Sequence, residues 1–295
     1  MTEFEIANWN KHIDKLQRNI IARDFPDVRD GLTETERGVL YSLFELSKNQ
    51  KTTQNLVDVP RLLGVTMGQY VPLGDPMLSS VITRFSSFFK TQNYPLLSVE
   101  GSVESDEYPI YRHWKCQLSE YGKKLFSNIE EECVDYSVNF DGIFIPESLP
   151  SAFPNLLCNG SKTIPGHEIF NVKKAILATI ENPEIKTEEL AIFLGKPKFA
   201  DNRILLDQDF LEYYSLGCQD IKFHYPNNEE VLIFQASNIV VDKNEVKLVK
   251  TKDIIQSYIE YRKDVISKIY IKQNGKAASE NELQQMLIES INSII

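Results

Sequence analysis

Three neighbouring residues, Tyr111, Arg112 and His113, combine two possible nucleophiles with a permanent cation. Tyrosine and histidine can both form covalent intermediates, and imidazole can be phosphorylated on nitrogen. Tyr108 lies three positions earlier. The residues do not decide between a nucleophile and an ordinary surface or half-packed histidine at position 113, so both interpretations stay open.

The other chemically capable residues form no recognisable site. Cys116, Cys133, Cys158 and Cys218 lack the paired spacing of a zinc site or a disulfide framework, which fits a reducing cytoplasm. The run of carboxylates at 130–132 is typical of a solvated helix end. We therefore expect neither a metal site nor a cofactor.

Composition excludes some classes of protein. The chain has 295 residues, 42% of them hydrophobic and 25% charged, as in globular proteins. It has no apolar run long enough to span a membrane and no signal-peptide pattern at its N-terminus, so we expect a cytoplasmic protein. A net charge of −10 argues against a protein that mainly wraps nucleic acid.

The pattern of the first 150 residues predicts a helix-rich unit. Residues 3–22 suit an amphipathic helix or arm, and a turn-rich connector follows at 25–32. Thr35 can cap the next helix, whose buried face would hold Val39, Leu40, Leu43, Phe44 and Leu46. Helices at 56–64 and 76–89 would form a helix-turn-helix unit, which either contacts DNA or only packs a core.

The rest of the chain predicts an α+β fold. We expect strands at 96–99 and 108–114, a helix at 118–128, and a boundary in the proline-rich segment 146–154. A helix from Ile169 should precede short strands at 231–235, 238–241 and 245–249. His167, just before that helix, favours a capping or packing role. Apolar residues at helical spacing recur from Ile255 to Ile291.

Several motifs, in order, resemble the A subunits of bacterial type IIA DNA topoisomerases, the gyrase A and topoisomerase IV A family. They cover nearly the whole chain. They are Arg23 with Pro26-Asp27-Val28-Arg29-Asp30-Gly31-Leu32; Gly68-x-Tyr70-x-Pro72-x-Gly74-Asp75; Arg112 through Gly142; Pro154-Asn155-Leu156-Leu157-x-Asn159-Gly160; and Ile164-Pro165-x-His167.

This resemblance implies a winged-helix DNA-binding domain, an α/β tower-like domain and a coiled-coil arm. We expect an N-terminal arm at 1–34, the winged helix at 35–150, the tower at 151–250 and a truncated arm at 251–295. The chain would stop before the family's C-gate dimerisation domain.

The sequence departs from the family pattern at the residues that carry its chemistry. His113 occupies the position of the catalytic tyrosine, and Val71 and Leu73 replace two histidines. Glu34 and Glu36 stand where the family has cations. The glycine-rich strand that wedges between base pairs is missing between Ser161 and Ile164.

Arginines survive at four family positions where the resemblance implies DNA binding: Arg23, Arg61, Arg84 and Arg112. Two hypotheses follow. The preferred one is a degenerate, non-cleaving protein that binds a partner, either itself, a true family A subunit or a B-type ATPase subunit, and binds DNA weakly if at all. The alternative is an active minimal subunit that cleaves DNA through His113 or Tyr111. A continuous basic groove would favour activity, whereas Glu34 and Glu36 pointing into that groove would favour degeneracy.

The C-terminal tail carries an apolar stripe that we expect to be buried rather than exposed to water: Leu283, Met286, Leu287, Ile291 and Ile294. The tail could fold back, with Gly275 as the bend, or pair with another copy. We expect a homodimer, because the family's winged-helix face is itself a symmetric contact.

Overall fold

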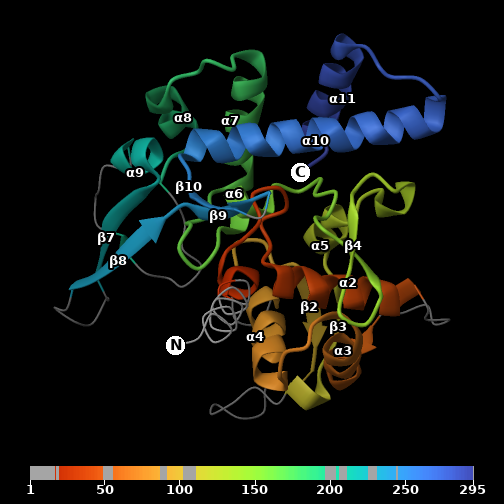
Figure 1. Cartoon of the computed structure of the whole chain (residues 1–295). Helices are drawn as coiled ribbons and strands as arrows, with labels where there is room; N and C mark the ends of the chain where they lie inside the picture. The colour runs from red at the N-terminus through yellow and green to blue at the C-terminus, as the bar shows by residue number, and fades with distance from the viewer. Residues whose placement is uncertain are drawn as a thin grey trace, which may run out of the picture.

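The protein has an α+β fold in which helices surround several small antiparallel sheets (Figure 1). This computed structural model describes residue 17 and residues 20–48, 56–86, 92–101, 111–196, 204–205, 211–224, 231–243 and 245–294. The predictions for most of the segment 3–22, for residues 87–89 and for Tyr108 lie outside these ranges. The α+β class expected from the sequence is confirmed.

The N-terminal half, up to residue 150, contains helices packed around a three-stranded sheet. Its elements are α2 (Glu34–Lys48), β1 (Val57–Asp58), α3 (Val59–Val65), the π-helix η1 (Thr66–Tyr70), α4 (Asp75–Phe85), β2 (Leu97–Glu100), the 3₁₀ turn η2 (Tyr111–His113), β3 (Lys115–Leu118), α5 (Glu120–Leu125), the 3₁₀ turn η3 (Ile129–Glu131), β4 (Tyr136–Val138) and β5 (Phe144–Pro146). β3 lies between β1 and β2 and is antiparallel to both, while β4 and β5 form a separate hairpin.

Helices α2 and α4 form where the apolar periodicity predicted them. Val39, Leu40 and Leu43 are fully buried in α2, and Leu78 and Ile82 are fully buried in α4. The two helices contact each other and α3, so their apolar faces close one core above the sheet.

The N-terminal cap of α2 differs from the prediction. Thr33, not Thr35, is the capping residue: its hydroxyl accepts a hydrogen bond from the Glu36 amide at 3.2 Å. The Glu36 carboxylate in turn accepts one from the Thr33 amide at 2.9 Å. This reciprocal pair is a capping box, and it begins the helix at Glu34. Thr35 instead hydrogen-bonds the carbonyl of Ala22.

The connector before α2 joins the two halves of the molecule. The amide of Val28 donates to the carbonyl of Val241, and the amide of Val241 donates to the carbonyl of Pro26. Gly31 adopts a left-handed conformation, and a Cβ there would lie 2.5 Å from the amide nitrogen of Leu156. Only glycine allows this close approach, so the connector fixes the position of α6 (Asn155–Asn159) against α2.

The C-terminal half contains further helices and two small antiparallel sheets. After α6, its elements are α7 (Ile169–Glu181), α8 (Thr187–Leu194), β6 (Ile204–Leu205), α9 (Leu211–Leu216), β7 (Cys218–His224), β8 (Val231–Ser237), β9 (Ile239–Asp242), β10 (Glu245–Leu248), α10 (Thr251–Asn274) and α11 (Glu280–Asn292). The sheets have the orders β6-β7-β8 and β9-β10.

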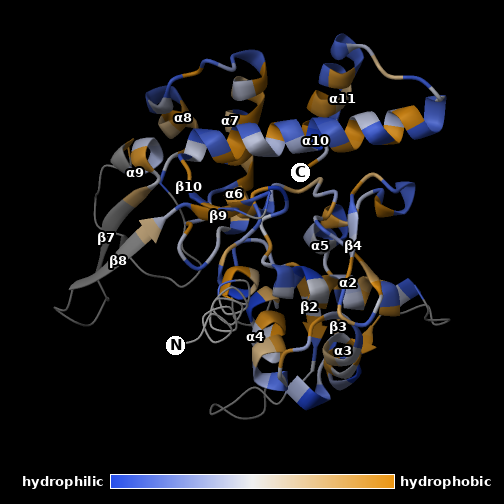
Figure 2. Cartoon of the chain, in the orientation of Figure 1, coloured by the Kyte–Doolittle hydropathy of each residue, from blue (hydrophilic) through white to orange (hydrophobic). Residues whose placement is uncertain are grey.

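The long helix α10 runs across the upper part of the molecule in Figure 1, packs against α7, α9 and α11, and reaches the N-terminal half through side-chain hydrogen bonds. Tyr258 donates a hydrogen bond to the carbonyl of Ala152, and Arg262 donates one to the carbonyl of Pro150. Apolar and polar residues alternate along α10 in Figure 2, as expected for a helix with one buried face. The buried apolar residues of both halves form one connected core.

The tail folds back on the same chain. α10 ends at Gly275, which has a φ of 69°, and α11 returns to pack against α7 and α10. Leu287, Ile291 and Ile294 are buried, and Lys124 donates a hydrogen bond to the Ile294 carbonyl at 2.6 Å. Within the described residues, α11 covers its apolar stripe by folding back, with the bend at Gly275.

Several element boundaries differ from the predictions. Residues 56–64 begin with strand β1, so α3 starts at Val59 and a π-helix continues it beyond Gly64. Of the strand expected at 108–114, the described residues Tyr111–His113 form a 3₁₀ turn, and a strand begins at Lys115. The helix expected at 118–128 spans only Glu120–Leu125 because Ser119 caps it and Asn128 turns left-handed. No helix in the described part of the chain is both long and apolar enough to cross a membrane.

Candidate nucleic-acid interface

The candidate site centres on the turn η2, which stands between α3 and the start of β3. The amide of Trp114 donates to the carbonyl of Tyr111 at 3.1 Å and closes the turn, and the Trp114 side chain is buried. Arg112 and His113 are exposed, and Tyr111 is half-buried. The turn therefore presents the possible nucleophiles at the surface on a buried aromatic anchor.

Tyr111 is held by a carboxylate from another element. Its hydroxyl donates a hydrogen bond to Oδ2 of Asp75, in the first turn of α4, at 2.6 Å. This hydrogen bond is the main cause that raises the pKa of the Tyr111 phenol, and Arg112 opposes it. A raised pKa keeps the phenol protonated at neutral pH, which is the opposite of what a phenolate nucleophile needs. The family motif ending in Gly74-Asp75 marked Asp75, but the sequence did not pair it with Tyr111.

The four arginines have different environments. Arg61 on α3 and Arg112 on η2 are both exposed, and these two elements contact each other. Arg23 is exposed and its guanidinium lies 3.7 Å from the sulfur of Met77. Arg84 forms an ion pair with Glu36 at 2.5 Å.

Glu36 does not have the groove-facing position that would have favoured degeneracy. Its side chain is 5% exposed, caps α2 and pairs with Arg84, so it does not point into a groove. A carboxylate three residues after a capping threonine satisfies the helix N-terminus, and this signal was present in Thr33-Glu34-Thr35-Glu36. Glu34, in the first turn of α2, is exposed. Glu36 also holds the guanidinium of Arg84, so Arg84 is a structural cation in this fold.

Val71 and Leu73 have become part of the core. Val71 is buried against Gly38 on α2, where an added Cβ would meet the valine side chain at 2.2 Å. Leu73 packs partly buried beside it. Residues that the resemblance pairs with histidines therefore hold the loop between η1 and α4 against α2 by apolar contact.

The segment where the family has its wedge strand is a tight turn. The amide of Ser161 donates to the carbonyl of Ile164 at 2.8 Å, and the Ser161 hydroxyl accepts a hydrogen bond from the Ile164 amide. Residues 160–165 are all described and form no strand.

His167, which lies outside the site, has structural contacts. His167 is buried, with Nδ1 3.3 Å from the Leu157 carbonyl and Nε2 3.1 Å from the Tyr214 hydroxyl. Burial lowers the pKa of His167 to about 4. His167 therefore packs before α7, as expected. Across the described ranges, no three His, Cys, Asp or Glu side chains gather closely enough to hold a metal ion.

The chain belongs to the family formed by the A subunits of DNA gyrase and topoisomerase IV, whose pattern matches residues 23–233. Among its relatives is the DNA gyrase A subunit of Thermotoga maritima, 32% identical over 248 residues, which are 80% of this chain and 29% of that protein. The DNA gyrase A subunit of Buchnera aphidicola is 29% identical over 83% of this chain and 32% of its own length. The DNA topoisomerase 4 A subunit of Rickettsia felis is 28% identical over 86% of this chain and 36% of its own length. The chain thus spans about a third of the length of these relatives.

Proposed function

We propose that this chain is a non-cleaving member of the gyrase A and topoisomerase IV A family that binds a protein partner through the family fold. The observation that carries the proposal is His113. By the resemblance, it stands where the family's tyrosine attacks DNA, and it is exposed on η2. Imidazole is shorter than a phenol, and displacing a nucleophile by about 1 Å costs on the order of a hundredfold in rate.

Other features support the same proposal. Glu36 forms an ion pair with Arg84, which engages that guanidinium within the fold. Aliphatic side chains stand at the positions that the resemblance pairs with histidines, and the segment 160–165 is a tight turn. The proposed division is a winged helix at 35–150, with α3, η1 and α4 as its helix-turn-helix, followed by a tower-like unit and the α10–α11 arm. The Glu36–Arg84 pair, the aliphatic residues and the turn at 160–165 would each weaken DNA cleavage or DNA bending.

A second candidate is a minimal subunit that cleaves DNA with Tyr111. Its favourable observation is the position of Tyr111, which lies on η2 next to Arg112 and presents its hydroxyl at the first turn of α4. Against it stands the hydrogen bond to Asp75, which raises the pKa of the phenol. The two candidates differ in one measurable step, a covalent bond from protein to DNA.

The test is a search for that covalent adduct. We expect no adduct when the protein is mixed with supercoiled DNA and magnesium, alone or with a type IIA ATPase subunit, and then denatured. We also expect His113→Tyr to remain inactive, because the other changes persist. An adduct that disappears in Tyr111→Phe or His113→Ala would contradict the proposal, and so would rescue by His113→Tyr alone.

The proposed partner is a second copy of this chain, joined through the winged-helix face, or an A-type or B-type subunit of the family. Folding back of α11 already covers the tail, so the homodimer rests on the winged-helix face alone. Light scattering at micromolar concentration measures the assembly, and a strictly monomeric mass would contradict the homodimer.

A further inference from the structure

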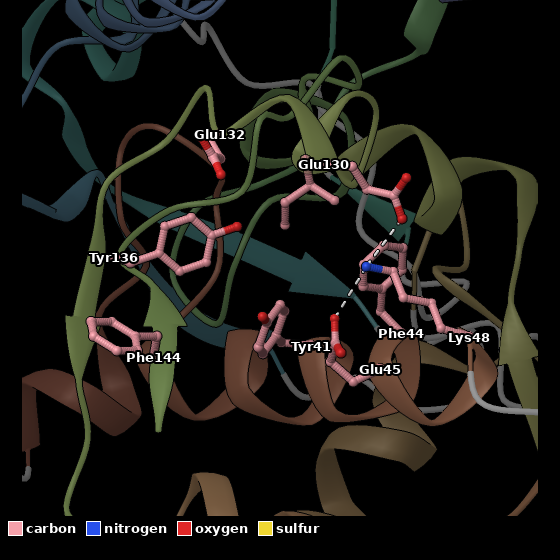
Figure 3. A pocket seen from close by; sticks show the side chains of 9 residues that line it. Tyr41, Phe44, Glu45, Lys48, Glu130, Glu132, Tyr136 and Phe144 are labelled. Atoms are coloured by element: carbon pink, nitrogen blue, oxygen red, sulfur yellow. Dashed lines mark ion pairs between the residues drawn. The ribbon is translucent and has the colours of Figure 1, made fainter. Parts of the chain in front are cut away.

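A cavity of about 490 Å³ lies between α2, η3 and the β4–β5 hairpin, apart from the candidate nucleic-acid interface (Figure 3). This volume is within the range of sites that hold small ligands or single side chains. Its lining combines four aromatic rings with three carboxylates and one lysine: Tyr41, Phe44, Tyr136, Phe144, Glu45, Glu130, Glu132 and Lys48, with Ile129 completing it. Aromatic faces and carboxylates both attract cations.

The cavity already binds one ammonium group, that of Lys48. The Lys48 Nζ lies 4.4 Å from the centre of the Phe44 ring. It also lies 3.3 Å from Glu45 and 3.1 Å from Glu130, as the dashed lines in Figure 3 mark. Burial opposes the charge, but the hydrogen bond to Glu130 and the charge of Glu45 outweigh burial and raise the pKa of Lys48. One side of the cavity thus shows how these residues accommodate a cation.

The other side of the cavity also combines aromatic rings with a carboxylate. Tyr136 and Phe144 stand opposite Lys48 in Figure 3, and Tyr41 on α2 lies between them and Lys48. Glu132 is at the rim with its side chain 83% exposed, and Lys272 contacts it at 3.4 Å. With Lys272 counted beside the lining residues, three carboxylates meet two ammonium groups, so this group of side chains carries a net charge of −1.

An apolar shelf continues from the mouth of the cavity along the hairpin. Val138 on β4 pairs directly with Phe144 on β5, so both side chains lie on one face of the hairpin, the face that also carries Tyr136. Val138 is 58% exposed and Phe144 is 61% exposed. A small free amine would fill the cavity and leave this shelf in water. A polypeptide can place a basic side chain in the cavity and cover the shelf with its neighbouring apolar residues.

We propose that this cavity binds a lysine or arginine side chain of a partner polypeptide, with apolar residues beside that side chain packing on the shelf formed by Val138 and Phe144. This inference rests on the partner-binding part of the proposed function and not on the loss of cleavage. The cation would stack between Tyr41, Tyr136 and Phe144 and face the carboxylate of Glu132. Charge complementarity favours this occupant, because the three glutamates outnumber the two lysines that contact them.

The test uses a fluorescein-labelled nonapeptide with a central lysine flanked by leucines, titrated with the full-length protein at physiological salt. We expect Glu132→Gln and Phe144→Ala each to weaken binding about fivefold to tenfold. Both side chains are largely exposed, so these changes should leave the fold intact. The matched controls are Glu189→Gln on α8 and Phe170→Ala on α7, exposed residues far along the chain, which should leave binding unchanged.

Two further arms separate the alternatives. The same peptide with glutamine in place of lysine should bind at least tenfold more weakly, and free spermidine should compete only at much higher concentration than the peptide. Spermidine that competes as well as the lysine peptide would overturn the proposal in favour of a free amine. Wild-type affinity for the lysine peptide in Glu132→Gln and Phe144→Ala, or no binding of that peptide by the wild type, would overturn it as well. None of these results depends on the adduct assay, so the two proposals fail separately.

Discussion

Asp30 holds together a buried charged cluster at the start of α2. Its carboxylate accepts hydrogen bonds from Nε and Nη2 of Arg37, at 2.7 and 3.1 Å, and from the amide of Leu149 at 2.9 Å. Arg37 is also within 3.7 Å of Asp27. The motif that carries the family resemblance therefore has a structural use here, because it joins the connector, α2 and the segment before α6.

At this residue scale, Asp30→Ala should destabilise the fold strongly. Removing one partner leaves the guanidinium of Arg37 buried with reduced compensation, which costs about 3–5 kcal/mol. The measurement is the free energy of unfolding in urea. The control is Asp24→Ala, which breaks an exposed pair with Lys162 and should cost no more than about 1 kcal/mol. Similar losses for both variants would contradict this view of Asp30.

His167 makes a second residue-scale prediction, a loss of stability in acid. Burial lowers its pKa in the folded protein to about 4, against an ordinary value of 6.5. As the pH falls from 6.5 to 4, His167 becomes protonated in the unfolded chain while it stays largely neutral in the folded protein. The free energy of unfolding should therefore fall by up to about 3 kcal/mol across this window.

The variant His167→Gln separates this effect from other acid-sensitive groups. Glutamine does not titrate, so the decline in unfolding free energy between pH 6.5 and 4 should be shallower than in the wild type, while both proteins should have parallel profiles between pH 7 and 8. Urea unfolding at a series of pH values measures both profiles. Identical slopes below pH 6.5 would show that His167 does not contribute.

At the scale of elements, the return of α11 depends on a few apolar side chains. Leu287 and Ile291 are 2% and 0% exposed. Replacing either with alanine should cost about 2–5 kcal/mol, because the cavity left behind cannot fill completely. Limited proteolysis should then cut near residues 275–279 and release α11, whereas Gln284→Ala, on the exposed face, should behave as wild type. Equal resistance of all three variants would contradict the folded-back arrangement.

The elements that the sequence predicted best are those with a local signal. α4, α7 and α10 follow their apolar periodicity, and Gly275 ends α10 in the left-handed conformation that favours glycine. The turn at Tyr111–His113 was predicted as a strand because its residue types suit one. Its actual form involves Trp114, whose amide closes the turn and whose side chain is buried against Gly101, a contact that the local sequence does not show.

At both candidate sites, the sequence could not predict contacts between residues far apart in the chain. The resemblance marked the positions of the arginines, but only the fold shows that Glu36 pairs with Arg84 and that Asp75 holds Tyr111. The cation-binding cavity was not predicted at all. Its residues come from α2, η3 and the β4–β5 hairpin, about a hundred positions apart at the extremes, and the run at 130–132 suggested only solvated carboxylates.

At the scale of the whole molecule, charge limits what the proposed winged-helix face can do with DNA. The net charge is −10, and of the four arginines at family positions Arg84 is paired with Glu36. Arg23, Arg61 and Arg112 are exposed. Because each phosphate contact releases counterions, the number of these contacts determines how steeply DNA affinity falls as salt rises.

We therefore expect weak DNA binding with a shallow dependence on salt. Three phosphate contacts correspond to a slope of about −3 in a plot of the logarithm of affinity against the logarithm of salt concentration, since each contributes roughly −0.9. Arg61→Gln and Arg112→Gln should each reduce this slope by about one unit, while Arg84→Gln should leave it unchanged because Glu36 already holds that guanidinium. Anisotropy of a labelled duplex between about 50 and 200 mM salt measures the slopes. Nanomolar affinity at physiological salt would contradict weak binding. A reduced slope in Arg84→Gln would mean that Arg84 leaves Glu36 to bind phosphate.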